Sequence, residues 1–450
     1  MVSLMETKNR SIQRQVQTLW RSLAPKGRLA LGLLVVFGVA LAISRLPQVL
    51  QSQNEPVPAG ETSPQAEADT VALGAGNPYP YGILPTNADI EDARRAYTDW
   101  KELYVKSSNV PDPDNMLRVF TGPQGQGMTT SEFQGYAMVF AAHLEADDTV
   151  LEKLWNYAQY YFNDVGLMKW KVDRDGIAEY NSSALDGDVD IAIALDYAAR
   201  RWPNQGWEER AEAYINNIIK PGGYSHLRTS PINTDEWPRW KRGLYLNYLA
   251  TAYMERFRER TGDERWVDIA IPNTYALLDY SYENFVLPAW FVDAEGRPVK
   301  PNDPWNSGPN RHDAGATRTN WRIASHYLIS GHPDAQRWAE KLTTFFYDAG
   351  QHWGSQDTGD FAPKNLRQGY RFMAEDDRPA GAPYGNRHET FETMMVAAGV
   401  PAMAAGQEEM TNEIYDFLAA DAQEADDNPM DNAMHVMGLL IMSGGLDAVR

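Results

Sequence analysis

Apolar residues recur at helical spacing through most of the chain, and this periodicity constrains the fold more than any other feature. In residues 190–202, four apolar side chains fall on one helix face: Ile191, Leu195, Ala198 and Trp202. About a dozen such segments follow one another, separated by loops that contain Gly, Pro, Asp and Asn. Alternating strand patterns are scarce. The sequence therefore predicts an all-α fold in which helical hairpins close into a ring, the (α/α)6 barrel or toroid. A helical solenoid is the alternative, but no fixed repeat period is present.

The N-terminus has the composition of a membrane-targeting segment. Residues 1–28 hold six Lys and Arg residues against one acid, and an unbroken apolar run covers residues 29–43. This order predicts a signal anchor at residues 29–46, with residues 1–28 in the cytoplasm and the rest of the chain outside it. A cleaved signal peptide is the alternative. The upstream cations argue against a buried core helix.

The next segment, residues 47–85, is rich in Gln, Glu, Pro, Ala and Gly. Such a composition cannot bury enough apolar surface to fold and is typical of a flexible linker. We therefore expect the folded domain to cover residues 86–450.

Net charge and residue usage exclude several classes of protein. The formal net charge of -20 argues against binding to nucleic acid, because an acidic surface repels phosphates. The chain has no Cys, its eight His are scattered, and it contains neither an HExxH nor a GxSxG motif. We therefore expect no metal, no cofactor and no serine nucleophile of the GxSxG kind.

Three segments combine acidic residues with glycine, aromatic or basic neighbours: 129–138, 183–192 and 311–324. In the first segment, Thr129 and Glu132 have the spacing of a helix capping box, in which Glu132 would bond a backbone N–H. The glycines around this segment also allow a tight turn that could direct the carboxyl into a cleft instead.

Asp186 lies in the second segment, just before a helix that we expect to begin near Asp188. The free N–H groups of a helix start would keep its carboxylate ionised. Capping the helix is an alternative role for Asp186, Asp188 or Asp190. These three acids also resemble part of a calcium loop, but Ile191 and Tyr197 occupy the positions where such a loop needs Gly and an acid.

In this order, the segments resemble glycoside hydrolase family 8. That family carries a Ser-Glu-Gly-Gln-Gly-Tyr-Gly-Met segment around its general acid, and residues 131–138 here read Ser-Glu-Phe-Gln-Gly-Tyr-Ala-Met. Residues 167–171 resemble the family block that holds a sugar-stacking Trp, and residues 184–195 resemble its Ala-Thr-Asp-Gly-Asp stretch. Residues 261–266 and 287–290 also resemble family blocks in order and spacing.

The resemblance implies an inverting hydrolase. Glu132 would be the general acid, Asp313 the general base that activates water, and Asp186 a residue that positions the sugar beside the scissile bond. Glu132 must then hold a proton near neutral pH, so we expect burial and nearby carboxylates to raise its pKa. An inverting pair needs a gap of roughly 6.5–9.5 Å for the water.

The resemblance also implies which residues bind substrate. Trp170 would stack on a sugar, Tyr136 would touch the acid or the sugar, and Arg318 would keep the base ionised by charge pairing. We further expect Trp237 and Trp240 to bind substrate.

Some residues depart from the family pattern beside the site: Phe133, Ala137, Leu185 and His312. Arg318 also follows Asp313 by five residues, where the family spacing is usually three. Either two residues are inserted here, or another acid is the base.

We therefore expect an endo-β-1,4-glucanase that acts on cellulose or a related exopolysaccharide. Lichenan, xylan and chitosan are alternative substrates, and a glycan-binding protein with an impaired active site is an alternative function. Periodicity alone would also allow an all-α solenoid scaffold. The anchor implies a bacterial cell envelope, with the catalytic domain in the periplasm or outside the cell. Its partners there would be a β-linked polysaccharide and the exopolysaccharide (cellulose) synthesis machinery.

Overall fold

The computed structural model describes residues 77–447 with internal gaps at 109–111, 122–126, 233–242, 300–309, 354–355, 358, 375–377, 385–391 and 421–427. Within the described residues there are twelve α-helices, and no strand is longer than three residues. This composition confirms the predicted helical class.

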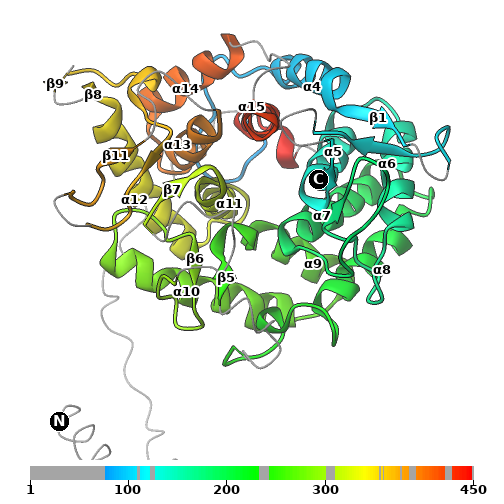
Figure 1. Cartoon of the computed structure of the whole chain (residues 1–450). Helices are drawn as coiled ribbons and strands as arrows, with labels where there is room; N and C mark the ends of the chain where they lie inside the picture. The colour runs from blue at the N-terminus through cyan, green and yellow to red at the C-terminus, as the bar shows by residue number, and fades with distance from the viewer. Residues whose placement is uncertain are drawn as a thin grey trace, which may run out of the picture. The chain divides into compact units, whose positions relative to one another are not determined.

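Six of these helices form an inner ring, in which each helix packs against the next and the last packs against the first (Figure 1). They are α5 (Ser131–Leu144), α7 (Leu185–Arg201), α9 (Thr251–Thr261), α11 (Ala314–Ser330), α13 (Glu392–Ala404) and α15 (Pro429–Met442). Helices α13 and α15 are buried along almost their whole length. A helix that is apolar on all sides needs neighbours on all sides, and the inner position supplies them.

The other six helices lie outside this ring, and most of them pack on an inner helix that is adjacent in the sequence. They are α4 (Ile90–Tyr104), α6 (Thr149–Tyr160), α8 (Trp207–Ile219), α10 (Ile271–Asn284), α12 (Pro333–Gly350) and α14 (Glu408–Ala420). Helix α4 shows why they lie outside. Its buried residues, which include Ala93, Tyr97, Trp100 and Tyr104, recur every three or four positions and form one apolar stripe.

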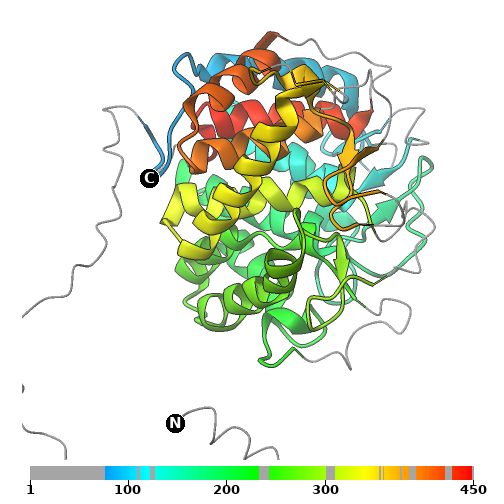
Figure 2. The same ribbon diagram turned by 90° about the vertical axis from the view of Figure 1, so that its left-hand side faces the viewer.

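Short antiparallel strands gather at one end of the helices (Figure 2). They are β1 (Val105–Ser107) with β2 (Leu117–Val119), β3 (Thr129–Thr130) with β4 (Lys171–Val172), β5 (Leu244–Tyr245) with β6 (Phe291–Val292), β8 (His352–Trp353) with β9 (Gln356–Asp357), and β7 (His312–Asp313) with β10 (Gly369–Tyr370) and β11 (Pro383–Tyr384). Strand β3 leads directly into α5, and β7 leads directly into α11. Their strand partners therefore fix where these two inner helices begin.

The folded domain begins earlier than the expected residue 86. Tyr79 is buried, and its hydroxyl donates to the backbone oxygen of Ile441 at 2.8 Å. The backbone N–H of Ile83 donates to the oxygen of Met403 at 3.0 Å. Tyr79 is also the first aromatic residue after the apolar run, and burying its ring ties this segment to α15.

In the part of the chain that the structure describes, no helix is both long and apolar enough to cross a membrane. The predicted anchor at residues 29–46, the basic segment before it and most of the predicted linker lie outside the described residues.

Candidate active site

Two glycines allow the first turns of α5 and α7 to touch. A Cβ atom on Gly187 would lie 2.4 Å from the carbonyl carbon of Ser131, and one on Gly135 would lie 2.8 Å from the Cβ of Asp190. Any side chain at these positions would push the two helices apart. This close approach brings Glu132 on α5 next to Asp186 on α7.

The structure does not place Glu132 in a capping box. Thr130 is the N-cap of α5, and its hydroxyl accepts from the backbone N–H of Phe133 at 3.4 Å. The other helix start also differs from expectation, because α7 begins at Leu185 rather than near Asp188. Asp186 therefore lies inside the first turn of α7 and is not its cap.

One guanidinium group joins the two acids. Nη1 of Arg318 forms an ion pair with Oε1 of Glu132 and lies 3.3 Å from Oδ2 of Asp186. The side chains of Arg318 and Asp186 are 6% and 5% exposed, whereas that of Glu132 is 18% exposed. Glu132 is thus the member of this cluster that reaches solvent. Burial and the neighbouring charge of Arg322 lower the pKa of Arg318 to about 9, so it remains a cation at neutral pH.

Tyr136 holds this cation in place. Its ring is fully buried, and its hydroxyl accepts a hydrogen bond from Arg318 at 3.1 Å. Tyr136 therefore has no solvent-accessible surface that a sugar could contact in this structure. The residue acts on the site through Arg318.

A second ion pair lies one helical turn further along the same two helices. Arg322 donates to both carboxylate oxygens of Asp190, at 3.1 and 2.7 Å, and both side chains are inaccessible to solvent. Asp186 and Asp190 are four residues apart on α7, and Arg318 and Arg322 are four residues apart on α11. Residues at this spacing share a helix face, so the two pairs form a ladder in the barrel interior.

Asp188 occupies a third, separate environment. It is fully buried and accepts hydrogen bonds from the hydroxyls of Tyr214 at 2.7 Å and Tyr224 at 2.8 Å. Burial raises the pKa of Asp188 to about 7, and the two hydroxyls limit this rise. The three acids of this segment thus have different partners, unlike the shared ligands of a calcium loop. Among the described residues, no group of three or more His, Asp or Glu side chains is placed to hold a metal.

We predict that Asp188→Asn reduces the pH dependence of stability. The folded pKa of about 7 lies above the ordinary value of 3.8, so folding takes up a proton between these values, and the wild type loses stability as pH rises through them. An asparagine does not titrate, so the stability of the variant should not fall for this reason as pH rises. Urea denaturation at about pH 4 and about pH 8 measures the difference. Asp99→Asn, on the exposed face of α4, is the matched control and should behave as the wild type does. An unchanged pH dependence in Asp188→Asn would contradict the prediction.

Asp313 lies at the same end of the inner ring as the other two acids. It is the N-cap of α11, is partly buried, and pairs through β7 with Gly369 of β10. Arg318, less than two turns further along α11, reaches both Glu132 and Asp186. The start of α11 must therefore lie beside the starts of α5 and α7.

His312 fixes the backbone in front of Asp313. It is fully buried, with Nδ1 3.0 Å from the carbonyl oxygen of Pro288 and Nε2 3.1 Å from the side-chain nitrogen of Asn320. A carbonyl only accepts, so Nδ1 carries the proton and Nε2 accepts. Burial lowers the pKa of His312 to about 4. His312 is therefore neutral at pH 7, and its two ring contacts hold the backbone directly before Asp313.

Trp170 lies close to the proposed acid. Its backbone oxygen accepts from the N–H of Ser131 at 2.9 Å, and its partly exposed ring stacks on Tyr180 with 5.7 Å between ring centroids. This placement fits a sugar platform. The other two predicted aromatic residues, Trp237 and Trp240, lie outside the described residues.

A further aromatic residue, Trp290, was not predicted as part of the site. Its partly exposed indole donates to Asn247 at 2.9 Å and packs so closely on Gly315 that a Cβ there would lie 2.5 Å from the ring. Gly315 is two residues after Asp313. The Pro-Ala-Trp block at residues 288–290 resembles a family block and so could have marked Trp290 as a candidate. The sequence could not show that Trp290 packs at the start of α11.

A ring of helical hairpins with three carboxyl groups where the inner helices begin suits a helical-barrel glycoside hydrolase, whose reaction needs a pair of carboxyl groups. Residues 79–353 match the model of glycosyl hydrolases family 8. This match covers more than half of the chain, so the chain belongs to that family. The resemblance noted in the sequence is confirmed.

Individual relatives agree with this assignment. The chain is 24% identical to Endoglucanase 2 of Ruminiclostridium josui over 396 residues, which cover 84% of this chain and 77% of the relative. It is 24% identical to the Beta-glucanase of Niallia circulans over 389 residues, which cover 80% and 86%. Among solved structures, the apo Beta-1,3-1,4-glucanase from Paenibacillus sp. X4 superposes with a TM-score of 0.67 at 20% identity, over 81% of this chain and 95% of the other.

Proposed function

We propose that Glu132 is the general acid of an inverting hydrolysis reaction and Asp313 its general base. The observation that carries this proposal is that Glu132 and Asp186 share the single cation Arg318. Two carboxylates beside one cation leave a net negative charge, and one added proton makes the cluster neutral. Burial penalises net charge, so the cluster favours retaining that proton. Glu132, the more exposed acid, is the one that can deliver it to a glycosidic oxygen.

Asp186 keeps its charge in this scheme. It lies in the first turn of α7, where the free N–H groups and helix dipole favour an anion, and it accepts from the backbone N–H of Gly187 at 3.0 Å. Its carboxylate oxygens are the groups that would accept hydrogen bonds from sugar hydroxyls. Asp313 would remove a proton from a water molecule as that water attacks the anomeric carbon from the face opposite the leaving group.

We infer that the substrate is a β-1,4-glucan. Relatives of this chain are named endoglucanase and Beta-glucanase, and a structural neighbour is a family 8 xylanase. Trp170 and Trp290 beside the acids supply the flat apolar surfaces on which the C–H faces of such sugars pack. Lichenan, xylan and chitosan remain the alternatives to test.

We predict that the enzyme releases the α-anomer from a soluble β-1,4-glucan. A single displacement by water inverts the anomeric carbon, whereas a double displacement through a glycosyl-enzyme would retain it. Proton NMR of the first products, recorded before mutarotation, distinguishes the two outcomes. The assay uses the full chain in mild detergent on carboxymethylcellulose, lichenan, xylan and chitosan. Initial β-anomer would refute inversion, and no hydrolysis of any of the four would favour a glycan-binding protein instead.

We also propose that residues 29–46 anchor the enzyme in a bacterial membrane, with the catalytic domain in the periplasm or outside the cell. The cationic segment before the apolar run supports this orientation. A tethered glucanase would act on a glucan as it leaves the cell, beside the exopolysaccharide (cellulose) synthesis machinery. Protease treatment of intact cells and spheroplasts tests this placement: a domain that stays protected in spheroplasts would refute it.

A further inference from the structure

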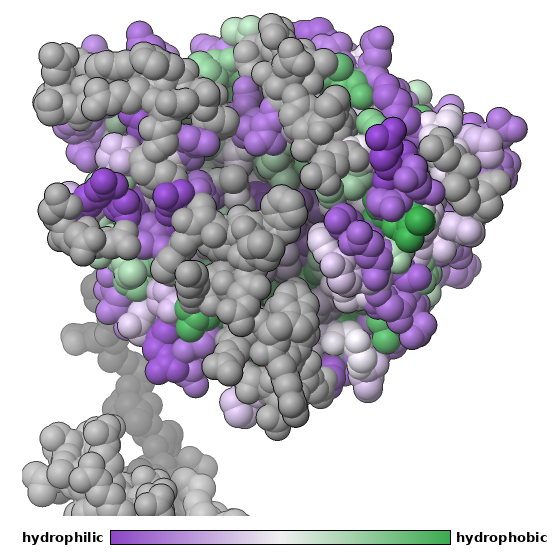
Figure 3. All heavy atoms as spheres, viewed as in Figure 1, coloured by the Kyte–Doolittle hydropathy of each residue, from purple (hydrophilic) through white to green (hydrophobic). Residues whose placement is uncertain are grey.

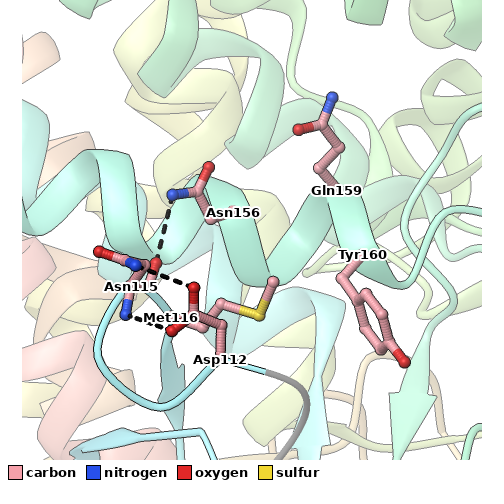
Figure 4. Close-up of a pocket in the computed structure, with 6 residues that line it drawn as sticks. All are labelled: Asp112, Asn115, Met116, Asn156, Gln159 and Tyr160. Atoms are coloured by element: carbon pink, nitrogen blue, oxygen red, sulfur yellow. Dashed lines mark hydrogen bonds between the residues drawn. The ribbon is translucent and has the colours of Figure 1, made fainter.

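A second candidate sugar site lies outside the acid cluster, at the C-terminal end of α6 (Figure 4). It is an open pocket of about 320 Å³ lined by residues from α6 and from the segment before β2: Asp112, Asn115, Met116, Asn156, Gln159 and Tyr160. None of these residues belongs to the machinery described above.

Tyr160 gives the pocket an exposed aromatic surface. The residue is 50% exposed, and large exposed hydrophobic side chains are few among the described residues. The described part of the face in Figure 3 is mostly hydrophilic. The ring of Tyr160 meets that of Tyr161 edge-on, at 90° with 4.9 Å between centroids. Tyr161 is itself buried and donates to the oxygen of Gly176 at 2.9 Å. The Tyr160 ring is therefore held against a fixed neighbour.

The other walls supply neutral hydrogen-bonding groups and one carboxylate. Asn156 donates to the backbone oxygen of Asn115 at 3.2 Å, and Asn115 donates to Asp112 at 2.8 Å. This second bond lowers the pKa of Asp112, which keeps its carboxylate an acceptor at neutral pH. Figure 4 shows Asn156, Gln159 and Tyr160 on α6, with Asn115 and Asp112 opposite Asn156 and with the Gln159 and Tyr160 side chains pointing in different directions. Each amide still has donors or acceptors to offer.

This lining selects among classes of ligand. No Lys or Arg lines the pocket, and the one charged lining group, the carboxylate of Asp112, repels a phosphate or other anion, although Lys153 lies close enough to help lower the pKa of Asp112. A lipid would need a broad apolar surface, and the lining has only one ring and one Met side chain. One aromatic face beside several amide and carboxylate groups is the chemistry that recognises a neutral sugar, whose C–H face stacks while its hydroxyls form hydrogen bonds.

The pocket lies at the same end of the barrel as the acids. Helix α5 begins beside Glu132, and α6 packs on α5 after a short connection, so α6 ends near the end where α5 begins. Strand β2, which directly follows Met116, supports the same conclusion. The N–H of Val119 on β2 donates to the side chain of Gln134, two residues after Glu132. A long polysaccharide held at the acids could therefore extend to this pocket on the outer side of the ring.

We propose that this pocket binds a β-linked glucan chain outside the catalytic cleft, with Tyr160 as its stacking surface. The proposal rests on the function proposed above, since it takes the same polymer as its ligand. A second contact on one long chain raises the local concentration of substrate at the cleft, whereas an oligosaccharide too short to span both sites gains nothing.

Tyr160→Ala tests this site by separating binding to the polymer from chemistry on a short substrate. The full chain in mild detergent is mixed with phosphoric-acid-swollen cellulose, and the protein left in solution gives the affinity. Glu132→Gln serves as the parent, so that the polymer is not consumed. Loss of one stacked ring should weaken binding about 2- to 10-fold. Gln159→Ala should also weaken it. With Glu132 intact, Tyr160→Ala should hydrolyse cellohexaose at the wild-type rate.

The matched control is Tyr280→Ala, because Tyr280 is also a partly exposed tyrosine on an outer helix but lies outside the pocket. It should bind swollen cellulose as the parent does. Equal binding by the Tyr160→Ala variant and the parent, or equal weakening by Tyr280→Ala, would overturn the surface site. The proposed function is judged separately. If the wild type hydrolyses the glucan but Tyr160→Ala binds swollen cellulose as the parent does, the pocket alone is refuted. If Tyr160→Ala weakens binding but the wild type hydrolyses no substrate, the pocket is supported and the hydrolase mechanism is refuted.

Discussion

Glu132→Gln is expected to lower kcat on a soluble β-1,4-glucan by about 10²–10⁴-fold, the usual cost of losing a general acid. Glutamine has the shape of glutamic acid but cannot donate the proton that the departing glycosidic oxygen needs. The fold should survive, because Arg318 keeps its contacts to Asp186 and Tyr136. Initial rates of reducing-end release and the thermal midpoint of unfolding measure the two effects separately.

The nature of the leaving group provides a sharper test of the same role. A dinitrophenyl β-cellobioside has a leaving group that departs without a proton, so Glu132→Gln should be far less impaired on it than on the glucan. Glu152→Gln is the matched control, since Glu152 pairs with Arg210 on the outer helices. It should leave both rates unchanged. If Glu132→Gln lowered the thermal midpoint and spared both rates, Glu132 would be a structural residue and not the acid.

Local periodicity was sufficient to predict the helices, and the lack of a fixed repeat period favoured a closed ring over a solenoid. Residues 190–202, for example, carry an apolar face at helical spacing, and all of them except Trp202, the C-cap, lie within α7 of the inner ring. The boundaries were less accurate, because caps depend on local geometry. Helix α7 begins at Leu185, three residues before the expected start. Its N-cap, Ala184, forms no side-chain cap, so the sequence carries no capping residue at the true start. The domain itself begins by residue 77, because Tyr79 finds a burial site on α15, far away in the sequence.

The candidate site was predicted only in part, again because contacts between helices far apart in the sequence are not visible in local motifs. Motifs identified Glu132, Asp186 and Arg318, but they assigned Arg318 to the base and did not predict that it joins Glu132 to Asp186. A signal did exist, because the i,i+4 spacing of the acids on α7 equals that of the two arginines on α11. Recognising it requires knowing that these helices face the same interior. The two tyrosines on Asp188 could not be predicted, since their contacts depend on tertiary packing alone.

The second large effect is expected at the proposed base. Asp313→Ala should lower kcat on a β-1,4-glucan by about 10²–10⁴-fold, because water then attacks without a group to take its proton. Asp313 makes no side-chain hydrogen bond that caps α11, and β7 still pairs with β10 through the backbone, so the start of α11 should stay in place. Asp334→Ala, which removes an acid from the start of a different helix, α12, is the matched control and should keep full activity.

Azide distinguishes a base from a residue that only positions substrate. Azide is already an anion and needs no base, and the alanine variant leaves room for it where the carboxylate stood. With Glu132 still protonating the leaving oxygen, azide should attack the anomeric carbon from the opposite face, restore turnover and leave an α-glycosyl azide at the new chain end. NMR and mass spectrometry identify this product. Wild-type activity of Asp313→Ala would remove Asp313 from the mechanism. If azide rescued Asp186→Ala and not Asp313→Ala, the assignment of the base would pass to Asp186, and the shared cation would then lie between an acid and a base.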